Sequence, residues 1–124
     1  MPVDDLPDDA IVVRGGIMRD LTHLGQQAED SLLADGVYAL SVFCGTLEQG
    51  ETLDERLAEV VEEAPIPNSQ IRVSTAGRLR AEGFRLEQFD EPASHYNVIL
   101  AEVPSPEAIT RFVAAFDPPR RNPR

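Results

Sequence analysis

The chain has 124 residues, near the usual size of one domain, and its 42% hydrophobic and 27% charged residues are typical of a folded protein. Its formal net charge of −11 excludes attraction to a polyanion over a broad surface, so extended DNA or RNA binding is not expected. No apolar run is long enough to span a bilayer and the N-terminus is acidic, unlike a signal peptide, which predicts a cytoplasmic protein.

Strands and helices alternate through the first part of the chain. The β-branched run AIVVR at residues 10–14 ends at two glycines and predicts a buried strand. Apolar residues then recur at helical spacing over residues 21–32, and Gly36 is suited to end that helix. The run VYALSVF at residues 37–43 predicts a second strand with both faces covered.

The second helix is predicted from a capping box formed by Thr52 and Glu55, and the proline at position 65 ends it. The run QIRVS at residues 70–74 predicts a third strand. Thr75 then caps a short helix, which Gly83 ends.

Two strands and a helix complete the pattern. Residues 84–89 alternate between apolar and polar and predict a half-buried strand, while HYNVILAEV at residues 95–103 is the strongest strand signal of the chain. The last helix begins with Ser105 as its N-cap and Pro106 in its first turn. Phe112, on the apolar face of this helix, is predicted to be buried.

The order β-α-β-α-β-α-β-β-α predicts a single α/β domain at residues 10–117, with three or four helices packed on a sheet of about five strands. Because a short connection joins the last two strands, they are expected to form an antiparallel hairpin within a mixed sheet. Residues 1–9 are expected to be a flexible acidic N-terminus, so that residues 1–8 are dispensable for folding. Residues 118–124 form an Arg/Pro-rich tail that either docks, on the fold or on a partner, or frays.

Arg14 is the first candidate binding residue. It ends the first strand, where a guanidinium can emerge from the core and hold a carboxylate or phosphate through two parallel hydrogen bonds. Gly15 and Gly16 would let such a ligand approach the backbone, close to a helix N-terminus. Alternatively, the two glycines form a tight turn and Arg14 pairs with a surface acid.

The Arg-Gly ending of the first strand resembles the first motif of ADP-ribosyltransferases, in which the arginine holds the phosphates of NAD. The run VSTAG, which contains Ser74, is similar to the second motif of that family, a strand carrying Ser-Thr-Ser, although alanine replaces the second serine. The resemblance implies a nucleotide-binding enzyme with Glu102 or Glu91 as its catalytic glutamate. Neither glutamate stands in the Glu-x-Glu frame of the family.

A second resemblance extends along nearly the whole chain. The runs VVRGG, LSVF, LRAEGF, HYNVIL and DPPRRNP resemble a family of short actinobacterial proteins without an assigned function. The absence of lysine among the 11 basic residues agrees with a GC-rich genome. This resemblance carries no activity to the chain.

Other chemistry-bearing residues give weaker signals. His95 could act as a base if the fold brings Ser74, Thr75 or Ser94 beside it, and otherwise it is a hydrogen-bonded structural histidine. Cys44, the only cysteine, lies in an apolar run and is expected to be a buried, inert thiol. No histidines or cysteines stand at ligand spacing, so neither a metal site nor a cofactor is predicted.

Charge is polarised between two predicted helices. The residues expected to bind a partner are acids of the second helix and arginines of the third: Glu55, Glu59, Glu62, Glu63, Arg78 and Arg80. The alternative is that these charges only keep the protein soluble.

The interpretation that follows is a small acidic intracellular protein-binding or regulatory domain, for example an antitoxin or immunity protein of a paired system. Its expected partner is a basic protein, and a homodimer is a further alternative. The competing hypothesis is a nucleotide-binding enzyme acting at Arg14. A pocket that joins Arg14, Ser74 and Glu102 would favour the enzyme.

Overall fold

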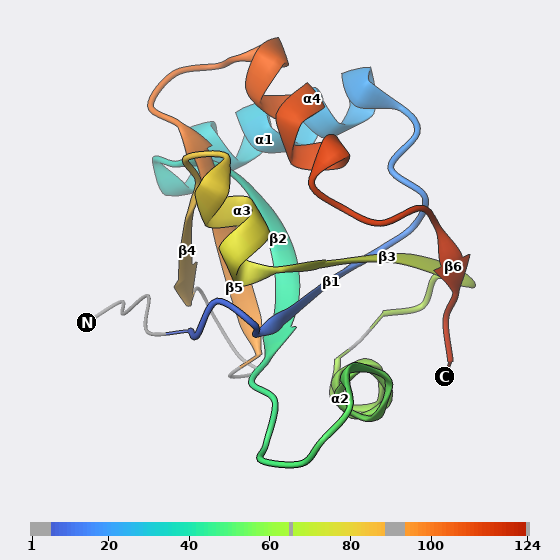
Figure 1. The fold of residues 1–124 in the computed structure, drawn as a ribbon. Coiled ribbons are helices and arrows are strands. Elements are labelled where there is room, and N and C mark those ends of the chain that lie inside the picture. Colours follow the sequence, from blue (N-terminus) through green and yellow to red (C-terminus); the bar gives the residue numbers. More distant parts are fainter. Residues whose placement is uncertain (1–5, 65, 89–93, 124) are drawn as a thin grey trace.

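The structure, a computed structural model, describes residues 6–64, 66–88 and 94–123 (Figure 1). Within these residues four helices pack against a six-stranded sheet of order β4-β5-β2-β1-β3-β6. The strands are β1 (Ile11–Gly15), β2 (Tyr38–Gly45), β3 (Gln70–Thr75), β4 (Arg85–Gln88), β5 (His95–Ala101) and β6 (Arg120–Arg121). The helices are α1 (Leu21–Asp35), α2 (Leu53–Glu63), α3 (Ala76–Ala81) and α4 (Pro106–Ala114).

The predicted α/β class is confirmed, and β4 and β5 form the expected antiparallel hairpin. The sheet differs from the expected mixed type, because every pair of neighbouring strands in the described residues is antiparallel. The reason lies in the strand order. The α2 crossover joins β2 and β3, which run in the same direction, but β1 lies between them and runs the opposite way.

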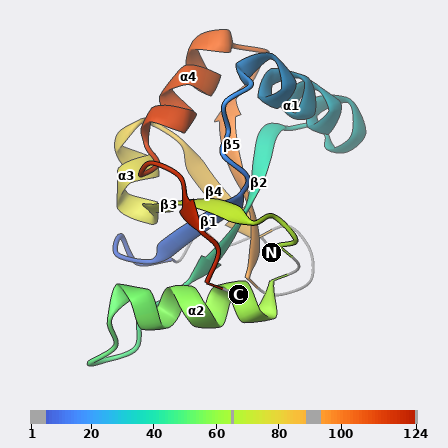
Figure 2. The ribbon, with the colours of Figure 1, turned by 90° about the vertical axis from the view of Figure 1, so that its right-hand side faces the viewer.

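Alternation along the strands builds a core on each face of the sheet. On one face, Val12, Leu40 and Val98 join a large apolar cluster beneath α1, α3 and α4. On the other face, Val13 and Val73 pack against the apolar side of α2. Figure 2 shows α2 on one side of the sheet and the other three helices on the opposite side.

The predicted capping signals are confirmed. Gly36 ends α1 with a left-handed φ of 79°, and Thr52 and Glu55 form the capping box of α2. Thr75 and Ser105 each accept a hydrogen bond from the backbone N–H three residues later, at the starts of α3 and α4. Position 65, where a proline was expected to end α2, lies outside the described residues.

The N-terminal segment is not the flexible appendage that its composition indicates. Leu6 is buried in the larger core cluster, and the carbonyl of Asp8 accepts a hydrogen bond from the backbone N–H of Gly77 at 2.8 Å. The Asp8 carboxylate pairs with Arg80 at 2.8 Å. The expected flexibility is therefore wrong for residues 6–8, whereas the dispensability of residues 1–8 for folding stays a prediction, and residues 1–5 lie outside the described residues.

The C-terminal segment docks on the fold. β6 extends the sheet beside β3. Asn122 is buried, and its side-chain amide donates to the carbonyl oxygens of Asn68 at 2.9 Å and Ile66 at 3.4 Å. Between the two open alternatives, docking and fraying, the structure therefore supports docking.

Candidate functional site

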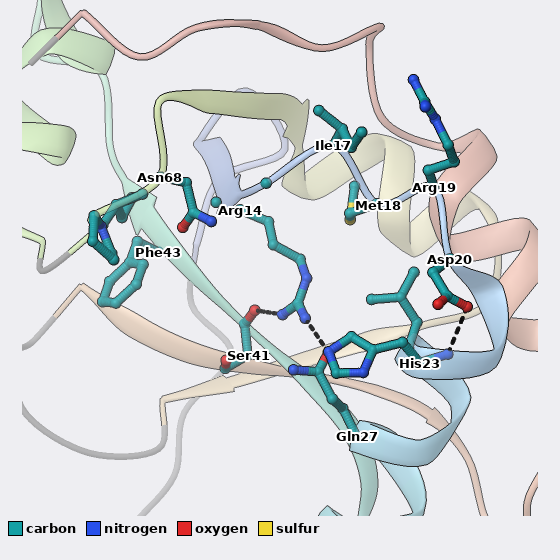
Figure 3. Close-up of a pocket in the computed structure, with 15 residues that line it drawn as sticks. Arg14, Ile17, Met18, Arg19, Asp20, His23, Gln27, Ser41, Phe43 and Asn68 are labelled. Atoms are coloured by element: carbon teal, nitrogen blue, oxygen red, sulfur yellow. Dashed lines mark hydrogen bonds between the residues drawn. The ribbon is translucent and has the colours of Figure 1, made fainter.

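The candidate site lies where β1 separates from β2. Their pairing stops at Val13 opposite Phe43, whereas β1 continues to pair with β3 as far as Gly15. The separation leaves a pocket of about 510 Å³, which we call the first pocket (Figure 3). It is lined by residues 14–20, His23, Leu24, Gln27, Ser41, Phe43 and residues 66–68.

The side chain of Arg14 crosses this gap (Figure 3). Its NH1 group donates to the carbonyl oxygen of Ser41 at 2.5 Å, and its NH2 group donates to Oε1 of Gln27 at 2.8 Å. Its Nε is sealed from solvent without an acceptor. Burial lowers the pKa of Arg14 to about 10, so the guanidinium still carries its charge at neutral pH.

No carboxylate in the described part of the chain pairs with Arg14. Asp20 also lines the first pocket, but its carboxylate caps α1 by accepting from the backbone N–H of His23 at 3.0 Å. Arg19 lines the pocket with its side chain pointing away from Arg14 (Figure 3). The expected alternative, in which Arg14 pairs with a surface acid, is therefore wrong for the described residues.

Arg72 lies directly opposite Arg14 in the pairing of β1 with β3 and, unlike Arg14, has a structural role. Its guanidinium donates to four carbonyl oxygens, those of Ile17, Val113, Phe116 and Asp117, at 3.4, 3.4, 3.1 and 2.8 Å. Three of these belong to the last turn of α4 and the residues just after it, where a cation is favoured by the helix dipole. The role of Arg72 could not be predicted from the sequence, because its partners are distant in the chain.

The glycines after Arg14 have a different use from the one expected. A Cβ atom on Gly15 would lie 2.3 Å from Oδ1 of Asn68, so glycine is required there for the Asn68 amide to lie against the strand. Gly16 has a φ of 89°, which only glycine adopts readily. The group that lies close to the backbone at Gly15 is therefore the side chain of Asn68, a residue of the protein itself.

The residues that the enzyme hypothesis requires do not lie in one pocket. Ser74 is buried under α4, where its hydroxyl donates to the carbonyl of Ala115 at 2.7 Å. Glu102 is exposed after β5, and neither it nor Ser74 lines the first pocket. Neither the first pocket nor the pocket beside His95 joins Arg14 to Ser74 and Glu102, so the observation that would favour the enzyme is not made for the described residues, and Glu91 lies outside them.

His95 has a structural contact and a place beside the site. Its ring stacks on Phe43, with 5.3 Å between the ring centroids. It also lines a second pocket of about 350 Å³, which shares Arg14, Gln27 and Ser41 with the first. The candidate nucleophile Thr75 is used as the cap of α3.

Asn97 is a site residue that the sequence analysis missed. It lines the second pocket, is only 7% exposed, and its side chain has no hydrogen-bond partner among the described residues. The other residues of this pocket are Asp30, Ser31, Ala34, Asp35, Ala39, Leu40 and His95. The sequence does show an asparagine inside a strong strand pattern. Which face of the sheet its side chain occupies could not be assigned without the fold.

The arginines predicted to bind a partner are engaged inside the protein. Arg78 pairs with Asp117 and Arg80 with Asp8, each at 2.8 Å. α3 is therefore not a free basic surface. On α2, Glu55 belongs to the capping box and Glu59 pairs with Arg56 at 3.0 Å.

The remaining two acids predicted on α2 differ from Glu55 and Glu59. Glu62 and Glu63 are exposed and form no ion pair within the described part of the chain. They lie on the side of the sheet opposite α3 (Figure 2).

In the described residues, no group of three or more histidine, cysteine, aspartate or glutamate side chains is placed to hold a metal ion. None of the described helices is both long and apolar enough to cross a membrane. Comparison with protein-family models, curated proteins and solved structures found no match to this chain. The two family resemblances stay predictions.

Proposed function

We propose that this protein is a ligand-binding protein whose first pocket takes the carboxylate or phosphate group of a small molecule on Arg14. The observation that carries the proposal is the half-buried guanidinium of Arg14, which has no carboxylate partner among the described residues. A partly desolvated charge without a counter-ion is costly to the folded state. An anion from solution would remove that cost.

The donors of Arg14 are arranged for such an anion. A guanidinium has five N–H groups, and Arg14 uses one on NH1 and one on NH2. The bonds to Ser41 and Gln27 fix the plane of the group, while the second proton of each terminal nitrogen stays available. Fixed geometry lowers the entropy lost when the anion binds.

Size and charge limit the ligand. A pocket of about 510 Å³ is within the usual range for small-molecule sites. The net charge of −11 opposes the approach of a polyanion, whereas a ligand with one anionic group is much less repelled. Apolar side chains such as Ile17, Phe43 and Ile66 line the same pocket and suit an organic ligand over a bare ion.

Substitution of Arg14 by lysine tests the proposal, because lysine keeps the charge and loses the planar fork. Titration calorimetry with short-chain carboxylates, inorganic phosphate, ATP and NAD should detect binding of at least one compound to the natural protein. Arg14→Lys should weaken that binding about tenfold or more, equivalent to roughly 1.4 kcal/mol. The free energy of unfolding should change by less than about 1 kcal/mol, since the ammonium can still donate to Ser41.

Arg85→Lys is the matched control, because Arg85 is exposed on β4 and lines neither pocket. It should bind the ligand as the natural protein does. If no compound of the panel binds, or if Arg14→Lys binds as tightly as the natural protein, the proposal is wrong.

A second candidate function is binding of a basic protein partner on α2, as in an antitoxin or immunity protein. It is favoured by the contrast between α3, whose arginines are paired internally, and α2, where Glu62 and Glu63 are unpaired in the described residues. An exposed acidic patch raises the rate of encounter with a basic partner.

Co-purification from the native host tests this candidate. The double variant Glu62→Lys, Glu63→Lys should lose a basic protein that the natural chain retains. The double variant Glu29→Lys, Glu102→Lys, which makes the same charge change at two exposed acids outside α2, should retain it. Recovery of the same proteins by both variants would contradict a role for α2.

A further inference from the structure

We propose that the ligand is a zwitterion of the amino-acid type, with its carboxylate on Arg14 and its cationic group beside Asp30 in the second pocket. This inference rests on the proposed anion site and names the class of its ligand. Its basis is that Arg14, Asn97 and Asp30 all line the second pocket.

The two pockets meet at the anion site. Arg14, Gln27 and Ser41 line both of them, so a ligand held by the guanidinium can extend into either. Both pockets contain an acid beyond Arg14: in the first, the carboxylate of Asp20 caps α1, whereas in the second, Asp30 pairs with no cation among the described residues. A ligand with a cationic group is therefore expected to extend into the second pocket.

The floor of the second pocket contains an unused hydrogen-bonding group. On β5, Tyr96 and Val98 point into the large core cluster, so the side chain of Asn97 between them points to the opposite face of the sheet. That side chain lines the second pocket, is more than nine-tenths buried and has no partner among the described residues. Buried amides are normally hydrogen-bonded, so an amide that faces a pocket without a partner in the protein is available to bind a ligand.

Asp30 supplies the negative charge at a suitable distance from Arg14. It follows Gln27, the Arg14 partner, by three residues on α1, which is about 4.5 Å along a helix axis. Its carboxylate accepts from the side-chain amide of Gln26 at 3.1 Å but pairs with no cation in the described part of the chain. Asp35 is about 12 Å beyond Gln27 by the same measure and is too distant for a short ligand.

These acids disfavour the nucleotide that the competing hypothesis requires. A polyphosphate held on Arg14 and extended into the second pocket would meet Asp30, and like charges at that range repel. A zwitterion avoids this repulsion, and because its net charge is zero the protein's overall charge of −11 does not oppose its approach.

Butyrate and 4-aminobutyrate form a matched pair of probes, because they share a carbon chain and differ by one ammonium group. By titration calorimetry the natural protein should bind 4-aminobutyrate at least about fivefold more tightly than butyrate. Asp30→Asn keeps the shape and the hydrogen bond to Gln26 but removes the charge. It should weaken 4-aminobutyrate about fivefold and leave butyrate unchanged or tighter, whereas Arg14→Lys should weaken both.

Glu29→Gln controls for general loss of negative charge, because Glu29 is exposed on α1 and lines neither of the two pockets. It should leave both affinities unchanged. If butyrate binds through Arg14 but 4-aminobutyrate binds no tighter, or if Asp30→Asn affects both probes alike, the zwitterion inference is wrong while the anion site stands. Tighter binding of ATP than of 4-aminobutyrate would also overturn the inference, and failure of every anionic probe would reject the anion site itself.

Discussion

Replacing Phe112 with alanine is expected to lower the free energy of unfolding by about 3–5 kcal/mol, the usual range for a fully buried phenylalanine. Phe112 has no exposed surface and belongs to the larger core cluster together with Val98 of β5. Its ring packs on Phe84 and Phe116, with centroid distances of 6.4 and 5.0 Å. Removing the ring leaves a cavity between α4 and the sheet, and urea denaturation measures the effect.

Val113→Ala is the matched control, since Val113 is the next residue of α4 and only partly buried. Its substitution should cost roughly 1 kcal/mol, because a smaller and partly solvated side chain is removed. A loss below about 1 kcal/mol for Phe112→Ala would mean that α4 packs on the sheet through another face.

Arg72→Leu is expected to lower the free energy of unfolding by about 2–4 kcal/mol. The substitution leaves the carbonyls after α4 without their donor and removes the cation at the C-terminal end of that helix. Burial lowers the pKa of Arg72, so its charge already bears a desolvation cost that the hydrogen bonds offset. The loss should appear in denaturation curves for the natural protein and the variant.

Arg85→Leu provides the comparison, because Arg85 is exposed on β4 and the ion pair that it forms with Glu87 in the described residues is long at 3.6 Å. It should change stability by less than about 0.5 kcal/mol. Equal effects of Arg72→Leu and Arg85→Leu would show that the four carbonyl contacts of Arg72 contribute nothing.

Local chemistry made much of the fold predictable. Capping pairs such as Thr52 with Glu55, and the positive φ of Gly36, are decided by residues close together in the chain. Strand direction is not local. A strand, a helix and a second strand give the same sequence pattern whether the two strands are neighbours or an opposite strand, such as β1, lies between them. The antiparallel pairing of the described strands could therefore not be derived from that pattern.

The candidate site was predictable only in part. The position of Arg14 at the end of a buried strand was visible in the sequence, but its lack of a carboxylate depends on α1 and β2. Asn97 and Asp30 become neighbours of Arg14 through strand pairing and helix packing. β6 was missed because a two-residue strand beside two prolines has no periodicity to detect.

The bond from Arg14 to the carbonyl of Ser41 also bears on aggregation. Where β1 leaves β2, the backbone of β2 would present an open edge, which in other chains is a template for intermolecular pairing. Arg14 occupies one acceptor on that edge and places a positive charge beside it. Arg14, which we propose binds the ligand, therefore also disfavours the pairing of another chain's strand with this edge of β2 when no ligand is bound.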